Sequence, residues 1–440
     1  EIAKIEQQLE NINAGTRYPQ EAINQMQTEI SKAETALKTA SSEKAAGILA
    51  ALKSAFESFL DGGTAANMSF HLISDMHVES SPDSNSYKNL ADGLTDMGMA
   101  NPDASAFVTV GDNTQDGRPE EFQAFNDILK AHLPVNDDSV MIALGNHDVR
   151  GPNSGDWQTT PGNPNAYWET AYDLYMKHSS DYMPETGGKT YYDRWIDGYH
   201  FIVLNPEDAP KDTAWLSDAQ LEWFEAKLAE NAELNKPIFV FIHQALNDSH
   251  WRSNVYNGFG PQDAKVKAIL SKYPQTVLCS GHIHNGFGAA EVISRPYGTL
   301  VDVPSFNYNQ IGKSGTGSAY EVYVYDDEIY FRARDFVAGE WLPEYDISVS
   351  LPGLPVTAYN AESLDSSLYT FESWVEVRPL IERYFEESSA LLNKKYDQSS
   401  LSGAGAVLPP SYLYHSDTYR QINAVQKQLA EAILALEEKG

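Results

Sequence analysis

Five short apolar runs in this chain each end in a polar residue or cluster of Asp, His or Asn, and this recurrence constrains the fold more than any other feature. The runs span residues 70–74, 107–110, 140–144, 238–242 and 276–280. The residues that follow them are Asp75-Met76-His77, Gly111-Asp112-Asn113, Gly145-Asn146-His147-Asp148, His243 and Gly281-His282-Ile283-His284. Short apolar runs bounded by turn residues are typical of buried strands. Because ligands bind at the carboxyl edge of the sheet in a layered α/β domain, we expect these polar side chains to meet there.

The residue types in these clusters indicate a metal site. A Gly-Asn-His-Asp loop alone would suit an ordinary surface turn equally well, because Gly and Asn favour turns for backbone reasons. The whole set, however, offers carboxylates, imidazoles and an amide, with no thiolate among them. Such ligands suit Mn, Fe or Zn better than a cysteine-type structural zinc site. The only cysteine, Cys279, lies within an apolar run, and we expect it to be a buried core residue.

The five motifs together resemble those of the calcineurin-like metallophosphoesterase family, in the same order along the chain. They are Asp-x-His, Gly-Asp, Gly-Asn-His-Asp, a lone His after a strand, and Gly-His-x-His, and the resemblance covers about residues 68–350. It implies an α/β fold in which two mixed β-sheets pack face to face and are flanked by helices, a four-layer sandwich. We place this domain at residues 68–352. Periodicity predicts helices at 119–133 and 217–231 and a hairpin of strands at 320–325 and 329–334.

The resemblance also implies two divalent or trivalent metal ions, Mn, Fe or Zn, with Asp112 bridging them. The remaining ligands would be Asp75, His77 and His284 for one ion, and Asn146, His243 and His282 for the other. In the family, a hydroxide that bridges the metals attacks phosphorus, and the histidine at the position of His147 protonates the leaving oxygen as general acid. Asp148 and Asp116 are both candidates for the carboxylate that orients His147. Asp116 lies one residue further from Asp112 than the matching aspartate in the family's protein phosphatases.

Substrate and subclass follow less directly from the sequence. Arg150 lies next to the central loop, and His250, Trp251 and Arg252 follow soon after His243. Each could contact the phosphate or leaving group, or could instead be a surface or packing residue. Phe306 and Tyr308, which follow the Gly-His-x-His motif, are candidate substrate contacts of the same kind. No tyrosine occurs between Asp112 and Phe122, which disfavours the ferric-tyrosinate purple acid phosphatases. The Gly-Asn-His-Asp and Gly-His-x-His pair resembles the class III cyclic nucleotide phosphodiesterases. We therefore expect a phosphodiesterase, with a phosphomonoesterase or nucleotidase as the alternative.

The charge of the chain narrows the choice of partners. Lys and Arg number 31 against 62 Asp and Glu, a formal net charge of −31. Such a chain repels long polyanions, so we expect no long nucleic acid as substrate and no docking on anionic membranes, while a small phosphate ester held by metals remains compatible. The charge also serves solubility. No apolar stretch reaches the ~18 residues of a membrane span, so we expect no membrane insertion.

Both ends of the chain have helical periodicity. We expect an N-terminal helical module at residues 1–60 with Pro19 in the first turn of its second helix, a linker at 61–67, and a C-terminal helical bundle at 358–440 in which Pro379 bends or breaks a helix. The C-terminal part resembles the FIVAR-type modules of secreted bacterial surface enzymes. This favours a secreted or cell-surface protein whose helical modules could contact the cell surface or glycans. The chain begins at Glu1 without a methionine or a signal peptide, from which we expect that its start was removed, by processing or by design. A surface adhesion or glycan-binding protein with a vestigial enzyme core is thus a second hypothesis.

The segment 149–197 departs from the regular alternation and is rich in Trp and Tyr. Its aromatic residues could form a lid that stacks on a sugar or nucleobase. The alternative, which we favour for most of them, is a satellite core under a long loop.

Overall fold

The computed structural model describes residues 16–18, 20–60, 62–157, 164–233, 236–295, 297–313, 315–350 and 364–392, together with isolated residues among the first ten and last twenty positions. Pro19, the boundary between 352 and 358, and much of the predicted C-terminal bundle lie outside these residues.

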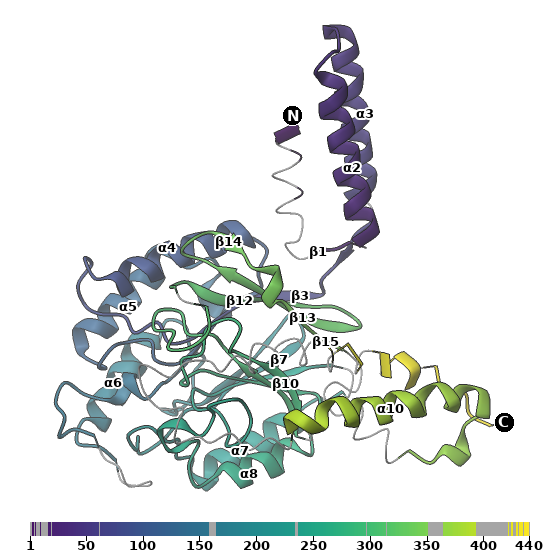
Figure 1. Cartoon of the computed structure of the whole chain (residues 1–440). Helices are drawn as coiled ribbons and strands as arrows, with labels where there is room; N and C mark the ends of the chain where they lie inside the picture. The colour runs from purple at the N-terminus through teal and green to yellow at the C-terminus, as the bar shows by residue number, and fades with distance from the viewer. Residues whose placement is uncertain are drawn as a thin grey trace.

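Two mixed β-sheets form the centre of the molecule, which confirms the predicted architecture (Figure 1). The first sheet contains, in spatial order, β10 (Val292–Arg295), β11 (Gly298–Asp302), β9 (Thr276–Ser280), β8 (Ile238–Phe241), β7 (Tyr199–Val203) and β6 (Tyr192–Ile196). The second contains β14 (Glu340–Trp341), β13 (Glu328–Asp335), β12 (Ser318–Val324), β3 (Met68–Ile73), β4 (Ala106–Val110) and β5 (Val140–Ala143), with β15 (Ile347–Ser350) also paired to β13. Strands β3, β4 and β5 are mutually parallel, as are β7, β8, β9 and β11, so their carboxyl ends share an edge in each sheet.

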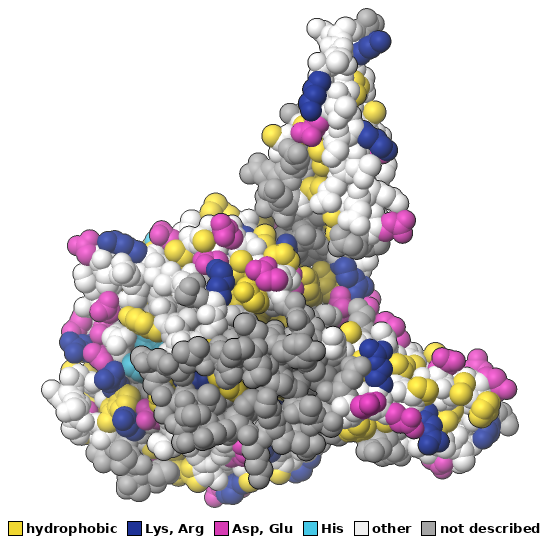
Figure 2. All heavy atoms as spheres, viewed as in Figure 1, with side chains coloured by type: hydrophobic (Ala, Val, Ile, Leu, Met, Phe, Trp, Pro, Cys, Tyr) yellow, Lys and Arg dark blue, Asp and Glu magenta, His cyan; other side chains and the backbone are white. Residues whose placement is uncertain are grey.

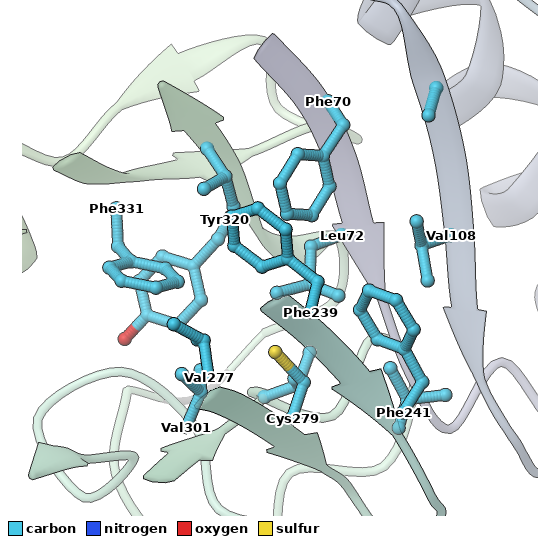
Figure 3. Packing of buried hydrophobic residues seen from close by; sticks show 14 of the residues in the cluster. Phe70, Leu72, Val108, Phe239, Phe241, Val277, Cys279, Val301, Tyr320 and Phe331 are labelled. Atoms are coloured by element: carbon cyan, nitrogen blue, oxygen red, sulfur yellow. The ribbon is translucent and has the colours of Figure 1, made fainter. Parts of the chain in front are cut away.

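The main hydrophobic core lies between the sheets, where the side chains of one sheet point toward those of the other (Figure 3). Phe70 of β3 makes edge-to-face contacts with Phe239 of β8 and Phe201 of β7, at ring-centroid distances of 5.0 and 5.2 Å. Such pairs contribute about 1 kcal/mol each beyond the burial of their area. Cys279 of β9 is buried in the same core, as expected.

Helices cover the outer faces of both sheets. Helices α4 (Asn85–Ala100), α5 (Pro119–His132) and α6 (Trp168–Ser179) share a core with β3, β4 and β5. Helices α7 (Asp218–Ala229) and α8 (Asp263–Leu270) pack on the other sheet. Two of these were predicted to within two residues at each end, because Pro119 suits the first turn and the Ser217 side chain accepts from the backbone N–H of Gln220.

The predicted hairpin is formed by β12 and β13, whose ends lie within two residues of the predicted ones, with Val324 opposite Ile329. The aromatic segment 149–197 contains α6 and β6. Tyr175 and Tyr182 belong to the core under the helices and Tyr192 to the core between the sheets, whereas Trp195 is 40% exposed. Most of these aromatic side chains therefore pack in a core, whereas Trp157 lies at the cavity described below.

At the N-terminal end, α2 (Gln20–Leu37) and α3 (Ser42–Leu60) lie side by side as a hairpin that projects from the domain (Figure 1). Basic, acidic and apolar side chains are interspersed along the hairpin face seen in Figure 2. The segment 61–67 was predicted to be a linker, but it contains β2 (Thr64–Ala65), which pairs with β1 (Thr16–Arg17). Arg17 also forms ion pairs with Asp327 and Glu328, so the base of the hairpin is attached to the domain.

At the C-terminal end, α10 (Phe371–Leu392) continues through Pro379, so the proline does not break this helix, which was one of the two predicted outcomes. Val377, Ile381 and Tyr384 on this helix pack against the core of α7 and α8, and this packing stabilises the helix despite the missing N–H of the proline. Among the described helices, none combines the length and the apolar character needed to cross a membrane.

Candidate metal centre and active site

The seven predicted metal ligands all lie at the carboxyl edge of the two sheets. Each follows a strand directly: β3 precedes Asp75 and His77, β4 precedes Asp112, and β5 precedes Asn146. Likewise, β8 precedes His243, and β9 precedes His282 and His284. The parallel strands bring these loops together although they are up to 209 positions apart in the chain (284 − 75). All seven side chains are almost completely buried apart from the slightly accessible His284.

One group of ligand atoms comes from Asp75, His77, Asp112 and His284, which lie within 4.8 Å of one another. His284 Nε2 is 3.2 Å from Asp75 Oδ1 and 3.3 Å from His77 Nε2. His77 Nε2 is 3.6 Å from Asp112 Oδ2. Two carboxylates and two imidazoles thus point at one small volume, which we call cluster 1.

A second group surrounds the other side of Asp112, and we call it cluster 2. His243 Nε2 lies 3.2 Å from Asp112 Oδ2 and 3.1 Å from Asn146 Oδ1. His282 Nδ1 lies 2.9 Å from the same Asn146 oxygen. Asp112 Oδ2 therefore belongs to both clusters, as a bridging carboxylate would.

The backbone of these loops is held in conformations that side chains rarely adopt. Asp75, His77, Asp112, His282 and His284 all have positive φ values, between 47° and 72°. Each such residue costs on the order of 1–3 kcal/mol, and such strain persists mainly at functional sites.

Two glycines of the motifs permit close approaches between these loops. A Cβ atom at Gly145 would lie 2.1 Å from Asp112 Oδ1, and one at Gly281 would lie 1.9 Å from Ser74 Oγ. Glycine at these positions therefore allows the clusters to form.

The hydrogen bonds around the clusters fit bound cations. His243 Nδ1 is 2.7 Å from the Val110 carbonyl oxygen, and His284 Nδ1 is 3.0 Å from that of Tyr308. A carbonyl oxygen can only accept, so each ring carries its proton on Nδ1 and directs its Nε2 lone pair at carboxylate oxygens. Asp112 Oδ2 and His282 Nε2 are buried and have no hydrogen-bond partner among the residues that the structure describes. Buried acceptors that face each other are costly unless a cation or proton lies between them.

The ionisation of these groups reflects the same pairing. Burial lowers the pKa of His243, but the Asp112 carboxylate, Asp75 and the Val110 carbonyl together outweigh this and raise it to about 9. Burial raises the pKa of Asp75, but His284 outweighs this and lowers it to about 2. Burial, assisted by the neighbouring His243, lowers the pKa of His282 to about 3, which keeps that ring neutral. Positive charge beside the two carboxylates is therefore strongly favoured, and neutral His282 retains a lone pair for a metal.

A comparison with protein-family models finds a match in the central part of the chain. Residues 68–286 match the model of the calcineurin-like phosphoesterases. The chain carries a calcineurin-like phosphoesterase domain. Together with the clustered Asp and His side chains, this supports metal-dependent hydrolysis of a phosphate ester. No curated protein sequence matches the chain.

Solved structures of low sequence identity also align with it. A dimetal phosphatase from Danio rerio aligns at 14% identity with a TM-score of 0.48, covering 65% of this chain and 99% of the other. Two structures of Vps29 from Entamoeba histolytica, a single mutant and the wild type complexed with zinc, align at 10% and 9% identity with TM-scores of 0.29 and 0.27. Each covers 64% of this chain and 99% of its own.

His147 of the phosphoesterase domain lies beside cluster 1, with its ring 4.5 Å from that of His77. Its backbone N–H donates to Asp112 Oδ1 at 2.8 Å, and its Nδ1 is 2.6 Å from the Gln115 carbonyl oxygen. That carbonyl holds the Nδ1 proton, so proton exchange with a substrate would use Nε2.

In the structure the Gln115 carbonyl, and neither of the two candidate carboxylates Asp148 and Asp116, faces Nδ1 of the His147 ring. Asp148 is fully buried and accepts five hydrogen bonds, from both nitrogens of Asn113, the N–H and hydroxyl of Thr114, and the N–H of Gly145. It thereby joins the loop after β4 to the loop after β5. Burial raises its pKa. Asp116 instead faces two guanidinium groups, at 3.1 Å from Arg118 and 3.4 Å from Arg150.

Arg150 is the one predicted substrate contact that lies at the cavity in front of the clusters. His250 and Arg252 do not reach it, because both are buried behind the Gly-His-x-His loop. Arg252 donates to the Ile283 carbonyl at 3.0 Å, and burial lowers the pKa of His250 to about 3. Phe306 is also fully buried, and Tyr308 places its ring 5.0 Å from His77 without lining the cavity.

The cavity has a volume of about 630 Å³ and is open on one side. Its floor comes from both clusters and His147. Its walls include Arg150 and Trp157, an aromatic residue of the segment 149–197, and also residues that the sequence did not mark, namely Lys211, Asp212, Tyr256 and Gln310. Arg150 and Lys211 both lie over the Trp157 ring, at 4.9 and 5.2 Å from its centroid.

Proposed function

We propose that this protein hydrolyses phosphate esters with two bound metal ions and slightly prefers phosphodiesters. The observation that carries the proposal is the position of Asp112 Oδ2, which is shared by both clusters and accepts no hydrogen bond from the described part of the chain. Asp75, His77 and His284 would hold one ion, Asn146, His243 and His282 the other, and Asp112 both. Two metal ions held in this way would neutralise and orient the ester and would generate a nucleophile from water near neutral pH.

His147 would donate a proton from Nε2 to the leaving oxygen. The Gln115 carbonyl fixes the His147 ring. The hydrogen bond from the His147 backbone N–H to Asp112 links the proposed general acid to the proposed bridging carboxylate. Arg150 Nη1 lies 3.5 Å from His147 Nδ1, so its guanidinium is placed beside the same end of the substrate.

The charge of the cavity walls supports the preference for diesters. Outside the proposed ligands and His147, the charged residues among the described lining are Arg150, Lys211, Asp116 and Asp212. Arg150 is paired with Asp116, and Lys211 is 3.9 Å from Asp212. The walls are thus formally neutral, which suits a singly charged diester better than a doubly charged monoester. A monoesterase or nucleotidase would use the same ligands and is the second candidate.

The test is hydrolysis of bis-p-nitrophenyl phosphate and p-nitrophenyl phosphate after chelation, with Mn, Zn or Fe then restored. Metal-dependent turnover with a higher kcat/KM for the diester is expected. A clear preference for the monoester would overturn the diester proposal. Absence of turnover with every metal, together with fewer than two metal equivalents per chain, would instead favour an adhesion protein with a vestigial core.

A further inference from the structure

We propose that Tyr256 is a substrate-binding residue whose hydroxyl donates a hydrogen bond to a phosphoryl oxygen of the ester, and that Gln310 and Arg252 position it. This inference rests on the proposed function and adds a second donor to the site. Tyr256 lines the cavity with its ring 5.4 Å from that of His282, a member of cluster 2. His147 lies beside cluster 1 instead, so the two donors flank the paired clusters.

The hydrogen bonds behind Tyr256 leave its proton available to a ligand. Arg252 Nη2 donates to Gln310 Oε1 at 2.6 Å, which fixes the orientation of the amide. Gln310 Nε2 then donates to the Tyr256 oxygen at 2.8 Å. The alternative, a bond from the hydroxyl to Gln310 Oε1, is longer at 3.1 Å and competes with the guanidinium for that oxygen. A phenol that accepts from the amide can donate its own proton into the cavity.

The network is attached to the proposed ligand loop at two points. Arg252, which is fully buried, donates to the carbonyl of Ile283, the residue between the two histidines of the Gly-His-x-His motif. The N–H of Gln310 donates to the His284 carbonyl at 2.9 Å. The position of the phenol is therefore coupled to that of the ligands.

The loop that carries Tyr256 adopts rare backbone conformations to place it there. Arg252, Tyr256 and Asn257 have φ values of 68°, 55° and 74°, in a region that non-glycine residues seldom occupy. The following Gly258 leaves no room for a Cβ atom, which would lie 2.1 Å from Asn247 Oδ1. Asn247 also accepts from the N–H of Phe259 at 2.7 Å, so the loop is held by its own side chains.

The ligand chemistry that fits this donor is a phosphoryl oxygen of an anionic ester. A phenol binds such an oxygen without adding a charge, which agrees with the neutral cavity walls and a singly charged diester. A hydrogen bond to a charged group is stronger than one between neutral groups.

The test compares Tyr256→Phe, which removes only the hydroxyl, with Tyr87→Phe, a half-buried tyrosine of α4 outside the cavity. Tyr256→Phe is expected to lower kcat/KM for bis-p-nitrophenyl phosphate and to weaken binding of inorganic phosphate, measured by calorimetry, each about tenfold. Its Tm and metal content should match those of the parent, and Tyr87→Phe should change neither readout. Equal kcat/KM and phosphate affinity in both variants would overturn the inference while leaving the proposed function intact.

Positioning by Gln310 is tested by Gln310→Ala and by the double variant with Tyr256→Phe. If the two residues act as one unit, the double variant loses no more than the more affected single variant. If the losses of the two single variants multiply in the double variant, Gln310 does not act by positioning Tyr256. An inactive parent whose phosphate binding still depends on the Tyr256 hydroxyl would refute the proposed function but retain this donor. A parent that neither turns over nor binds phosphate would refute both.

Discussion

The floor and the walls of the cavity are formed by different parts of the chain. The floor residues could be predicted from the sequence, whereas most wall residues could not. The floor consists of motif residues that follow strands directly, such as Asp112 after β4 and His282 after β9. The walls contain Trp157, Lys211, Tyr256 and Gln310, which come from loops without a motif. The comparison teaches that the chemistry of this site is encoded by strand ends, whereas contacts to the substrate depend on loops whose paths only the structure shows.

Replacing a floor residue should have the largest effect. Asp112→Asn removes the one carboxylate shared by both clusters, so we expect turnover to fall about 1,000-fold or more, corresponding to a loss of several kcal/mol of transition-state stabilisation. Metal content measured by mass spectrometry should fall as well. Activity within tenfold of the parent with two metals retained would show that Asp112 is not the bridging ligand.

Loss of the proposed acid should be severe but should depend on the leaving group. His147→Ala is expected to slow hydrolysis of esters with poor leaving groups by about 100- to 10,000-fold, and that of p-nitrophenyl esters much less. Rates over a series of leaving groups of increasing pKa check this. An equal loss for all of them would assign His147 to binding rather than proton transfer.

A substitution of Asp148 tests whether this motif residue stabilises the floor or takes part in the chemistry. Asp148→Asn places an amide NH2 group among donors that now converge on a carboxylate, so we expect a loss of about 2 kcal/mol in the free energy of unfolding. Chemical denaturation measures it. If stability were unchanged and only poor leaving groups were affected, Asp148 would act on His147 after all.

The fold and the gathering of the seven proposed ligands at one edge of the sheets were predictable, because both follow from where strands end along the chain. An apolar run followed by a polar cluster identifies a strand and its end, and parallel strands place the ends together. Two misplaced side chains share a cause, which is that closeness in sequence does not imply contact. Asp148 adjoins His147 in the chain but faces the loop after β4. Arg252 lies nine positions from His243 (252 − 243), yet it is buried behind the cavity. The β1–β2 pair was missed because its partners are far apart in the chain and only two residues long.

The charge balance of the walls predicts a change in substrate preference. Asp116→Asn removes the carboxylate that faces Arg150 and gives the walls a net positive charge. Since the pair is partly exposed, the effect should be modest, and we expect the ratio of kcat/KM for monoester over diester to rise up to about fivefold. An unchanged ratio would mean that wall charge does not set the preference.

The smallest effect is expected at Lys211, which lies at the open wall. Its side chain is 46% exposed and its nearest carboxylate, Asp212, is 3.9 Å away, so solvent screens its charge. Lys211→Met should change kcat/KM for bis-p-nitrophenyl phosphate by no more than about threefold. Lys265→Met is the matched control, because Lys265 is similarly exposed and pairs with Asp218 away from the cavity. If Lys211→Met instead lost as much activity as Tyr256→Phe, the walls would bind the ester mainly by charge, and the contrast between a charged floor and a neutral wall would fail.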